Sequence, residues 1–163
     1  MDGPGGENRG FAGKRSGVTT SPTVLSIPDG FEPHFRRSPL TDPWEPLYSR
    51  REGSRLCLGL HLDERHCNAR GIAHGGLVSA LADNAMGLAC VLGAAGKAAG
   101  AVTASLTVDF VGAARPGQWL EIAADPVRIG GTLAFGAAVI TVGEEVVARA
   151  SGVFRMLAVK DNR

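Results

Sequence analysis

One carboxylate in this chain lies where a charged side chain is costly. The segment from Gly76 to Gly93 is almost entirely apolar or small, and Asp83 is its only charged residue. No Lys or Arg stands three or four residues away, so a helix here would leave Asp83 without an ion-pair partner on its own surface. Two interpretations remain open at this point: a structural ion pair with a distant residue, or a carboxylate that acts on a substrate.

The residues just before that segment could supply hydrogen-bond donors. They run Asn-Ala-Arg-Gly-Ile-Ala-His-Gly-Gly, from Asn68 to Gly76. Glycines at the start of a helix leave backbone N–H groups accessible, and these groups and the helix dipole favour negative charge on a ligand. A purely structural explanation also exists for each residue: close packing for the glycines, a turn for Asn68, and a loop-fixing hydrogen bond for His74.

The apolar spacing predicts that the segment from Gly76 to Gly93 forms one long helix. Its leucines recur at intervals of four and seven residues and form a single stripe (Leu77, Leu81, Leu88 and Leu92). Asp83 points to the opposite side, with small residues around it (Gly76, Ser79, Ala80, Gly87 and Cys90). We interpret this helix as a buried core helix and not as a membrane span, because Asp83 lies in its middle and its length is marginal for a bilayer.

Alternation of apolar and polar residues predicts five strands around that helix. The expected strands cover residues 55–61, 102–110, 119–129, 133–142 and 146–157. We expect a break or bulge at Pro126 and a tight turn at Gly130–Gly131. On the second strand, Thr103 is expected to face the opposite side from Leu106 and Phe110.

The order of these elements predicts an α+β fold. The last four strands are separated by short turn sequences, and we expect them to pair in hairpin succession. A single antiparallel sheet that curls around the one helix satisfies this order best. Such a sheet covers only part of the helix, so we expect a second subunit to cover the face that carries Asp83.

Length and composition limit the remaining possibilities. We expect residues 1–28, rich in Gly, Ser, Thr and Pro, to be a disordered tail, and residues 29–163 to form one domain. Residues 30–51 carry four prolines and are expected to be irregular, with a short helix around 31–36. A net charge of +1 and 6% aromatic residues argue against a nucleic-acid partner. Three cysteines and no apolar N-terminal run favour the reducing cytoplasm.

The motifs together resemble those of the hot-dog fold acyl-CoA thioesterases of the phenylacetate-pathway and 4-hydroxybenzoyl-CoA type. The run N-x-x-G-x-x-H-G-G is followed by L-x-x-x-L-A-D, which ends at Asp83. The resemblance covers about residues 30–157 and implies a hot-dog fold that hydrolyses an acyl-CoA thioester to a free acid and CoA. It implies that Asp83 is the general base or the nucleophile. The loop residues Asn68, His74 and Gly75 would orient water and polarise the carbonyl, and Thr103 would assist.

The resemblance also implies where CoA binds. The candidate contacts are helix-start, turn and cationic residues: Gly76, Arg115, Arg128, Gly130, Gly131, Thr132 and Arg155. Relatives frequently carry a basic residue where this chain has Gly131, and this departure leaves open a carrier-protein thioester as the substrate. The resemblance implies no cofactor other than CoA as part of the substrate, and a homodimer that pairs further into a homotetramer. We expect no membrane and no nucleic acid as partner.

The spacing of two candidate residues predicts an active site shared between chains. Gly75 and Asp83 are eight residues apart, so about 12 Å of helix axis separates them. One thioester group cannot reach both in the same chain, but two helices running antiparallel about a two-fold axis would bring Gly75 of one chain to Asp83 of the other.

Other kinds of site and function are weaker interpretations. A metal site built from His61, His66, Cys67 and His74 would be scattered by strand geometry, so no metal is expected. Cys90 has no His beside it to activate a thiol and is expected to be core. The motifs of hot-dog dehydratases and hydratases are absent. A non-catalytic acyl-CoA-binding module stays open, although binding alone has no use for a buried carboxylate at the thioester.

Overall fold

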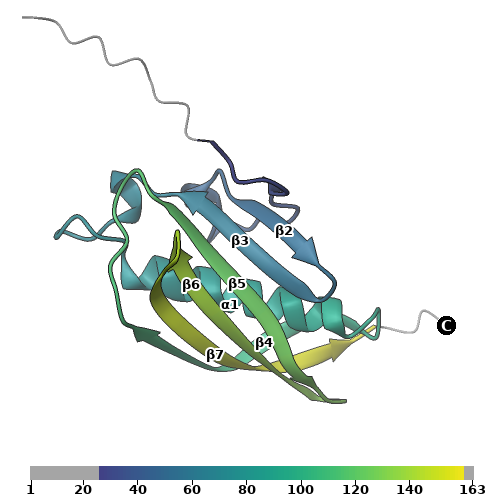
Figure 1. Ribbon diagram of the computed structural model, residues 1–163. Coiled ribbons are helices and arrows are strands. Elements are labelled where there is room, and N and C mark those ends of the chain that lie inside the picture. The colour runs from purple at the N-terminus through teal and green to yellow at the C-terminus, as the bar shows by residue number, and fades with distance from the viewer. Residues whose placement is uncertain (1–25, 160–163) are drawn as a thin grey trace, which may run out of the picture.

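A seven-stranded antiparallel sheet curls around one long helix in residues 26–159, the part of the chain that the computed structural model describes (Figure 1). This arrangement confirms the predicted sheet and helix. The predicted tail lies outside the described residues except for positions 26–28, where the Ser26 carbonyl lies 3.3 Å from His61 Nε2.

The elements follow in the order strand, strand, strand, helix, and then four strands. The strands are β1 Glu32–Pro33, β2 Tyr48–Glu52, β3 Arg55–His61, β4 Ala98–Phe110, β5 Trp119–Ile129, β6 Leu133–Val142 and β7 Glu145–Ala158. The helix α1 spans Gly75–Gly93, and short 3-10 turns cover Asp42–Trp44 and Glu64–His66. Neighbouring strands in the sheet run β1-β2-β3-β5-β6-β7-β4.

The predicted hairpin succession is wrong for β4. This strand pairs with β7 at one edge of the sheet, and β5 pairs instead with β3, where Leu58 stands opposite Ile122. The connection between β4 and β5 is too long for a tight hairpin, and it passes the N-terminal end of α1, where Ala114 accepts a hydrogen bond from the amide of Ala73. Among the last four strands, short turns join only β5 to β6 and β6 to β7. The irregularity predicted at Pro126 is confirmed by a register shift between Pro126 and Arg128.

The segment before β3 is more regular than predicted. No helix forms at 31–36: Glu32 and Pro33 form β1, which pairs with Ser49 and Tyr48 of β2. The sequence of β2 is polar and lacks alternation, so its strand character comes from pairing with β3 through a turn at Gly53, which has a φ of +63°. Phe31 and Leu47 of this segment are buried and anchor it to the domain, whereas Phe35 is exposed.

The core lies between α1 and the concave face of the sheet. The leucine stripe of the helix is buried there together with apolar side chains of β3, β5 and β6 (Leu77, Leu81, Leu88, Leu58, Ile122 and Ile140). Among the described residues α1 is the one helix long and apolar enough to cross a membrane, with a mean hydropathy of 1.5. Its leucine stripe packs instead against the sheet, as predicted for a core helix.

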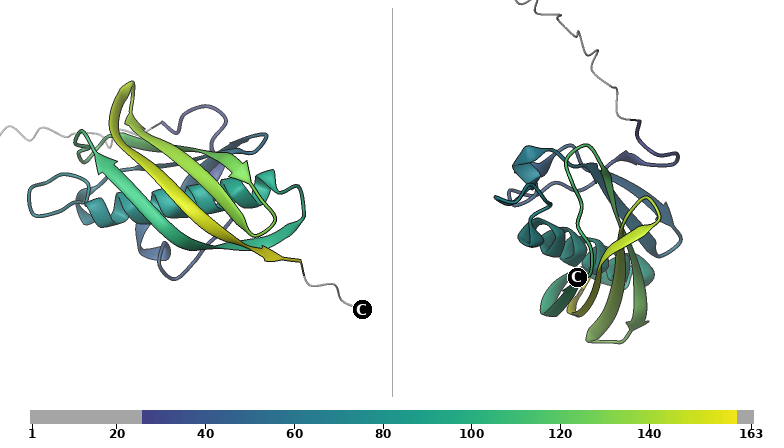
Figure 2. Two further views of the ribbon diagram at one scale, coloured as in Figure 1. Left: turned by 90° about the horizontal axis from the view of Figure 1, so that it is seen from below. Right: turned by 60° about the vertical axis from the view of Figure 1, so that its left-hand side comes forward.

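The strands lie on one side of α1 (Figure 2), so one face of the helix remains partly exposed. This open face carries Gly76, Ser79, Ala80, Asp83 and Gly87, as predicted. Cys90 does not belong to it: the side chain is fully buried, and a Cβ on Gly136 of β6 would lie 3.4 Å from its Sγ. Burial raises the pKa of the Cys90 thiol to about 11, which is unfavourable for a nucleophile and agrees with a core role.

Candidate active site

The carboxylate of Asp83 accepts a hydrogen bond from a hydroxyl group and forms no ion pair within residues 26–159. It lies half-buried on the open face of α1, and Thr103 Oγ1 donates a hydrogen bond of 2.6 Å to Asp83 Oδ1. Within residues 26–159 no Lys, Arg or His nitrogen lies within 4.0 Å of this carboxylate. The structural ion pair considered for Asp83 is therefore not formed in the described part of the chain.

A bulge in β4 explains how Thr103 reaches the helix. Opposite β7, Thr103 pairs with the buried Phe154, whereas Ser105 pairs with Val153, so Ala104 is an extra residue between them. The extra residue reverses which face of the sheet the β4 side chains before it point to. Thr103 consequently faces α1, on the same side as Leu106, and the predicted opposite orientation is wrong.

The carboxylate and the hydroxyl open into a cavity of about 180 Å³. Its lining comes from the N-terminal segment, the open face of α1, β4 and β7: Arg36, Ser38, Asp83, Asn84, Gly87, Leu88, Val91, Ala101, Thr103 and Phe154. The arginine and serine had not been singled out from the sequence. They lie some 45 residues from Asp83 in the chain, and only the folded segment brings them to it.

At the N-terminus of α1, His74 caps the helix, and the amide of one glycine donates no hydrogen bond within the described residues. His74 Nδ1 accepts a 2.9 Å hydrogen bond from the N–H of Gly76, so the imidazole acts as the helix N-cap. A Cβ at position 76 would lie 2.9 Å from the same nitrogen, so a glycine lets the ring fold back over the helix. The Gly76 amide is thus occupied within the chain. The N–H of Gly75 donates to no atom of residues 26–159.

Asn68 stabilises its own loop and borders a second cavity. Its Oδ1 accepts a 2.9 Å hydrogen bond from the N–H of Arg70, which is the turn role considered from the sequence. Asn68 and Gly75 together line a cavity of about 190 Å³, whose other walls come mainly from β4, β7 and the connection after β4. Phe110 packs over this end of the helix, 3.3 Å from the point where a Cβ of Gly75 would lie.

The candidate residues therefore fall into two groups within one chain. Asp83 and Thr103 share one cavity, and Asn68 and Gly75 share the other. The two groups lie on the same helix and are separated by about 12 Å along its axis. A single thioester group cannot contact both in one chain.

Most of the candidate CoA contacts gather at the turn between β5 and β6. Arg128, Gly130 and Thr132 line one hollow there, and Gly131, Thr132 and Arg155 line an adjoining one. The Gly130–Gly131 turn, as predicted, joins the two strands, with the Gly130 N–H donating to the carbonyl of Leu133.

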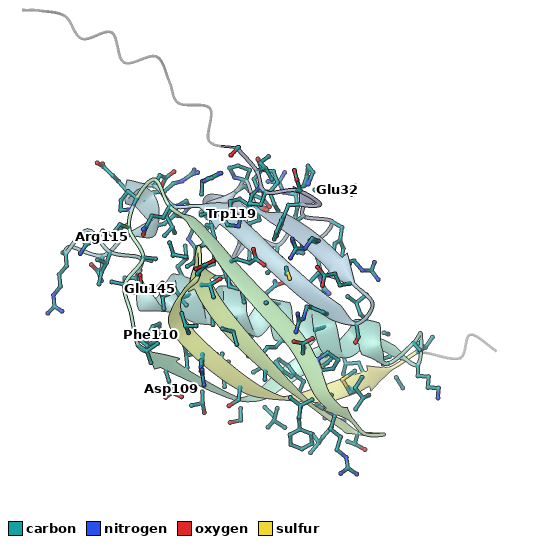
Figure 3. All side chains as sticks on the ribbon, viewed as in Figure 1. Glu32, Asp109, Phe110, Arg115, Trp119 and Glu145 are labelled. Atoms are coloured by element: carbon teal, nitrogen blue, oxygen red, sulfur yellow. The ribbon has the colours of Figure 1, made fainter. Side chains whose placement is uncertain are left out.

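Arg115 does not join that group. It follows the loop that contacts the start of α1, and Figure 3 places it at the opposite end of the molecule from the β5–β6 turn. The turn lies beside the end of the helix, so roughly 27 Å of helix axis separates the two positions.

Lys97 is a cation at the turn that the sequence reasoning missed. It lines a cavity of about 450 Å³ with Gly130 and Gly131, between the end of α1 and the β5–β6 turn. It is also the only charged residue between Asp83 and Asp109, a signal that could have singled it out. It places a positive charge beside Gly131, where a basic residue is absent.

The amino-acid sequence of this chain is similar to a family profile and to a bacterial protein. The profile of the thioesterase superfamily matches residues 70–149. A stretch of 134 residues is 42% identical to a Pseudomonas aeruginosa protein named "Putative esterase", and the match covers 82% of this chain and 99% of that protein.

Solved structures resemble the fold. A Streptococcus mutans UA159 protein bound to acetyl-CoA matches with a TM-score of 0.67 at 22% identity, over 78% of this chain and 98% of that chain. The Escherichia coli PaaI protein from the phenylacetic acid degradation operon matches with a TM-score of 0.63 at 21% identity, over 69% and 80% of the two chains.

Proposed function

Because this chain belongs to the thioesterase superfamily, and is thus a thioester hydrolase with the expected hot-dog fold, we propose that it hydrolyses acyl-CoA thioesters with Asp83 as the catalytic carboxylate. The observation that carries the proposal is the 2.6 Å hydrogen bond between Thr103 Oγ1 and Asp83 Oδ1 at the wall of a cavity. This bond fixes one carboxylate oxygen, and Oδ2 has no hydrogen-bond partner among residues 26–159, so it can take part in the reaction. The structural neighbour bound to acetyl-CoA supports CoA as the carrier.

The proposed reaction needs one base and one hydrogen-bond donor. Asp83 Oδ2 takes a proton from a water molecule while the water oxygen bonds to the thioester carbon. The carbonyl electron pair moves to oxygen, and the N–H of Gly75 donates to the resulting oxyanion. When the carbonyl re-forms, the C–S bond breaks and the CoA thiolate leaves, taking up the proton. The alternative is a nucleophilic Asp83 that displaces CoA and forms an anhydride, which water then hydrolyses.

A site shared between two chains would unite the groups that one chain keeps apart. The open face of α1 is lined by small residues, so a second helix can approach it closely. The edge of β4 is also free: within the described residues it pairs only with β7, and it exposes Val102, Leu106 and Phe110. In a two-fold dimer with antiparallel helices, Gly75 and Asn68 of one chain would face Asp83 and Thr103 of the other.

The proposals of a homotetramer, of CoA as the carrier and of a cytoplasmic location each rest on one structural observation. Apolar side chains on the outer face of the sheet (Val127, Leu133, Phe135 and Val139) offer a surface through which dimers would pair into a homotetramer. Lys97 and Arg128 at the β5–β6 turn favour the phosphates of CoA over a carrier protein. The three cysteines, Cys57, Cys67 and Cys90, are free, which suits the cytoplasm.

A thiol-release assay over a panel of acyl-CoAs tests the activity, and complementation tests the shared site. Asp83→Asn and Asn68→Ala variants are each expected to be inactive, and they are then unfolded and refolded together in equal amounts. Random pairing makes about half of the dimers mixed, each with one intact site, so roughly a quarter of wild-type activity should return. Recovery no greater than the mean of the two parent variants would rule out sharing. Release of thiol from no acyl-CoA at all would refute the proposed substrate class.

A further inference from the structure

The cavity beside Asp83 contains a cation that the proposed hydrolysis does not use. Arg36 lines this cavity, and no carboxylate of residues 26–159 lies within 4.0 Å of its guanidinium. The neighbouring Arg37 behaves differently, because its Nε lies 3.2 Å from Asp42 and 3.8 Å from Glu45. Two adjacent arginines thus differ: Arg37 is paired with acidic residues of its own chain, whereas Arg36 lines the cavity with no ion-pair partner among residues 26–159.

A second polar group in the same wall also lacks a partner. The side-chain Oδ1 of Asn84, next to Asp83 on α1, is buried and makes no hydrogen bond to the described residues. The oxygen and nitrogen of an amide are interchangeable by rotation, so this group can present either an acceptor or two donors to the cavity. Ser38, by contrast, already shares a 3.0 Å hydrogen bond with Thr41.

These walls suit an acyl group that is itself polar and negatively charged. An alkyl chain would leave the buried Asn84 amide oxygen without a partner, which is unfavourable. It would also place apolar atoms against Arg36, which is exposed and keeps its hydration in the single chain. A carboxylate could accept hydrogen bonds from both. It would also need the arginine, since Asp83 in the same cavity otherwise repels it.

We propose that Arg36, with Asn84, forms a subsite for a carboxylate at the far end of the acyl group. The preferred substrates are then monothioesters of short dicarboxylic acids. This inference rests on the proposed function, because it places the thioester at Asp83 and Thr103. Arg36 and Asn84 line the same cavity as Asp83 and Thr103, so only a short chain can separate the thioester from the carboxylate.

The test compares two substrates of equal chain length, glutaryl-CoA and pentanoyl-CoA. Wild-type protein should hydrolyse the glutaryl thioester with the higher kcat/KM. Arg36→Met should lower the glutaryl-to-pentanoyl ratio of kcat/KM about 10- to 100-fold, and Arg36→Lys should lower it less. Arg37→Met is the matched control and should leave the ratio unchanged, since Arg37 is paired with Asp42 and Glu45.

Two kinetic outcomes would overturn the subsite. One is a wild-type enzyme that favours pentanoyl-CoA or shows no preference. The other is an equal loss on both substrates in Arg36→Met, which would mean that Arg36 acts on the thioester or CoA that they share.

Titration with free glutaramate and free pentanamide, whose amide groups replace the thioester, separates this inference from the proposed function. Glutaramate, which keeps the distal carboxylate, should bind more tightly than pentanamide to the wild-type protein, and Arg36→Met should abolish the difference. This result is expected whether or not a CoA thioester is hydrolysed. A difference that survives in Arg36→Met, or no difference in the wild type, would refute the subsite even if the thioesterase activity is present.

Discussion

Thr103 of β4 donates its hydroxyl proton to Asp83 of α1 over 2.6 Å, and a β-bulge at Ala104 is what points it there. Without the extra residue, Thr103 would face the outer side of the sheet with Arg149 and Ser151, whose β4 partners are Asp109 and Thr107. The irregular strand therefore orients the proposed catalytic carboxylate.

Replacement of the carboxylate is expected to remove catalysis and preserve the fold. Asp83→Asn keeps an oxygen that can accept the hydrogen bond from Thr103, but it cannot take a proton from water. We expect kcat for the best acyl-CoA to fall on the order of 10²- to 10⁴-fold with little change in Tm. Asp109→Asn, an exposed carboxylate on β4, is the matched control and should retain activity. Near-wild-type turnover by Asp83→Asn would exclude Asp83 from the mechanism.

The hydroxyl of Thr103 should matter more than its methyl group. Thr103→Val keeps the shape but leaves Asp83 Oδ1 without its hydrogen bond, so we expect kcat to fall about tenfold or more. Thr103→Ser should retain most of the activity. Ser105→Ala is the control, since Ser105 is paired with Val153 on the outer side of the bulge. Equal kinetics for the Val and Ser variants would show that the hydrogen bond is incidental.

Lys97 is expected to act on substrate affinity alone. Lys97→Met removes a cation from the cavity beside Gly130 and Gly131, so KM for acyl-CoA should rise several-fold at low salt while kcat changes little. The same variant assayed with an N-acetylcysteamine thioester, which lacks the nucleotide, should match the wild type. A similar loss on both substrates would place Lys97 away from the nucleotide.

Gly59 should not tolerate a side chain. A Cβ on this residue would lie 2.1 Å from Cζ2 of Trp119, which packs across the strand and contacts the rings of Phe31 and His61. Gly59→Ala should therefore destabilise the fold by about 2 kcal/mol or more, which is a fall in Tm of roughly 4 °C or more. Gly131→Ala, where a Cβ meets nothing within 4 Å, is the control for thermal unfolding. An unchanged Tm for Gly59→Ala would mean that Trp119 can move aside.

Two buried histidines predict a loss of stability in mild acid. The pKa of His34 and the pKa of His66 are both lowered from 6.5, chiefly by burial. The unfolded chain therefore takes up protons first, so stability is complete above about pH 6.5 and falls as pH drops towards the folded-state pKa values. Thermal unfolding between about pH 8 and pH 5 measures this slope. His34→Phe should flatten it, and an identical pH dependence in wild type and variant would contradict the assignment for His34.

The sequence was sufficient to predict the helix, most of the strands and the candidate motif, because these features depend on local patterns of residues. Leucine spacing located α1 to within one residue, and alternation located β5, β6 and β7, because each of these elements buries one regular face. The alternating leucines also located β3, although this strand is buried on both faces. The motif around Asn68 and the isolated Asp83 identified groups that the fold places at two cavities of the same helix.

The features that were missed depend on contacts between distant segments. The place of β4 beside β7 depends on pairing with a strand far along the chain, which no local pattern encodes. The strand β2 has a polar sequence and exists by pairing with β3. The bulge at Ala104 and the positions of Arg36 and Lys97 at the cavities likewise arise only when the whole sheet has formed.

If pairing occurs along the free edge of β4, catalytic activity would depend on the concentration of the protein chain. If the site is completed only by a partner, a chain that has folded and not yet paired is correctly structured and inactive. Helical signal would then recover in a first-order step during refolding, while activity would follow a second-order step that slows on dilution. Between the two steps the exposed strand is available to any other strand edge, so slow pairing would favour aggregation. The amount of chain made would thus set both how much enzyme is active and how much is lost.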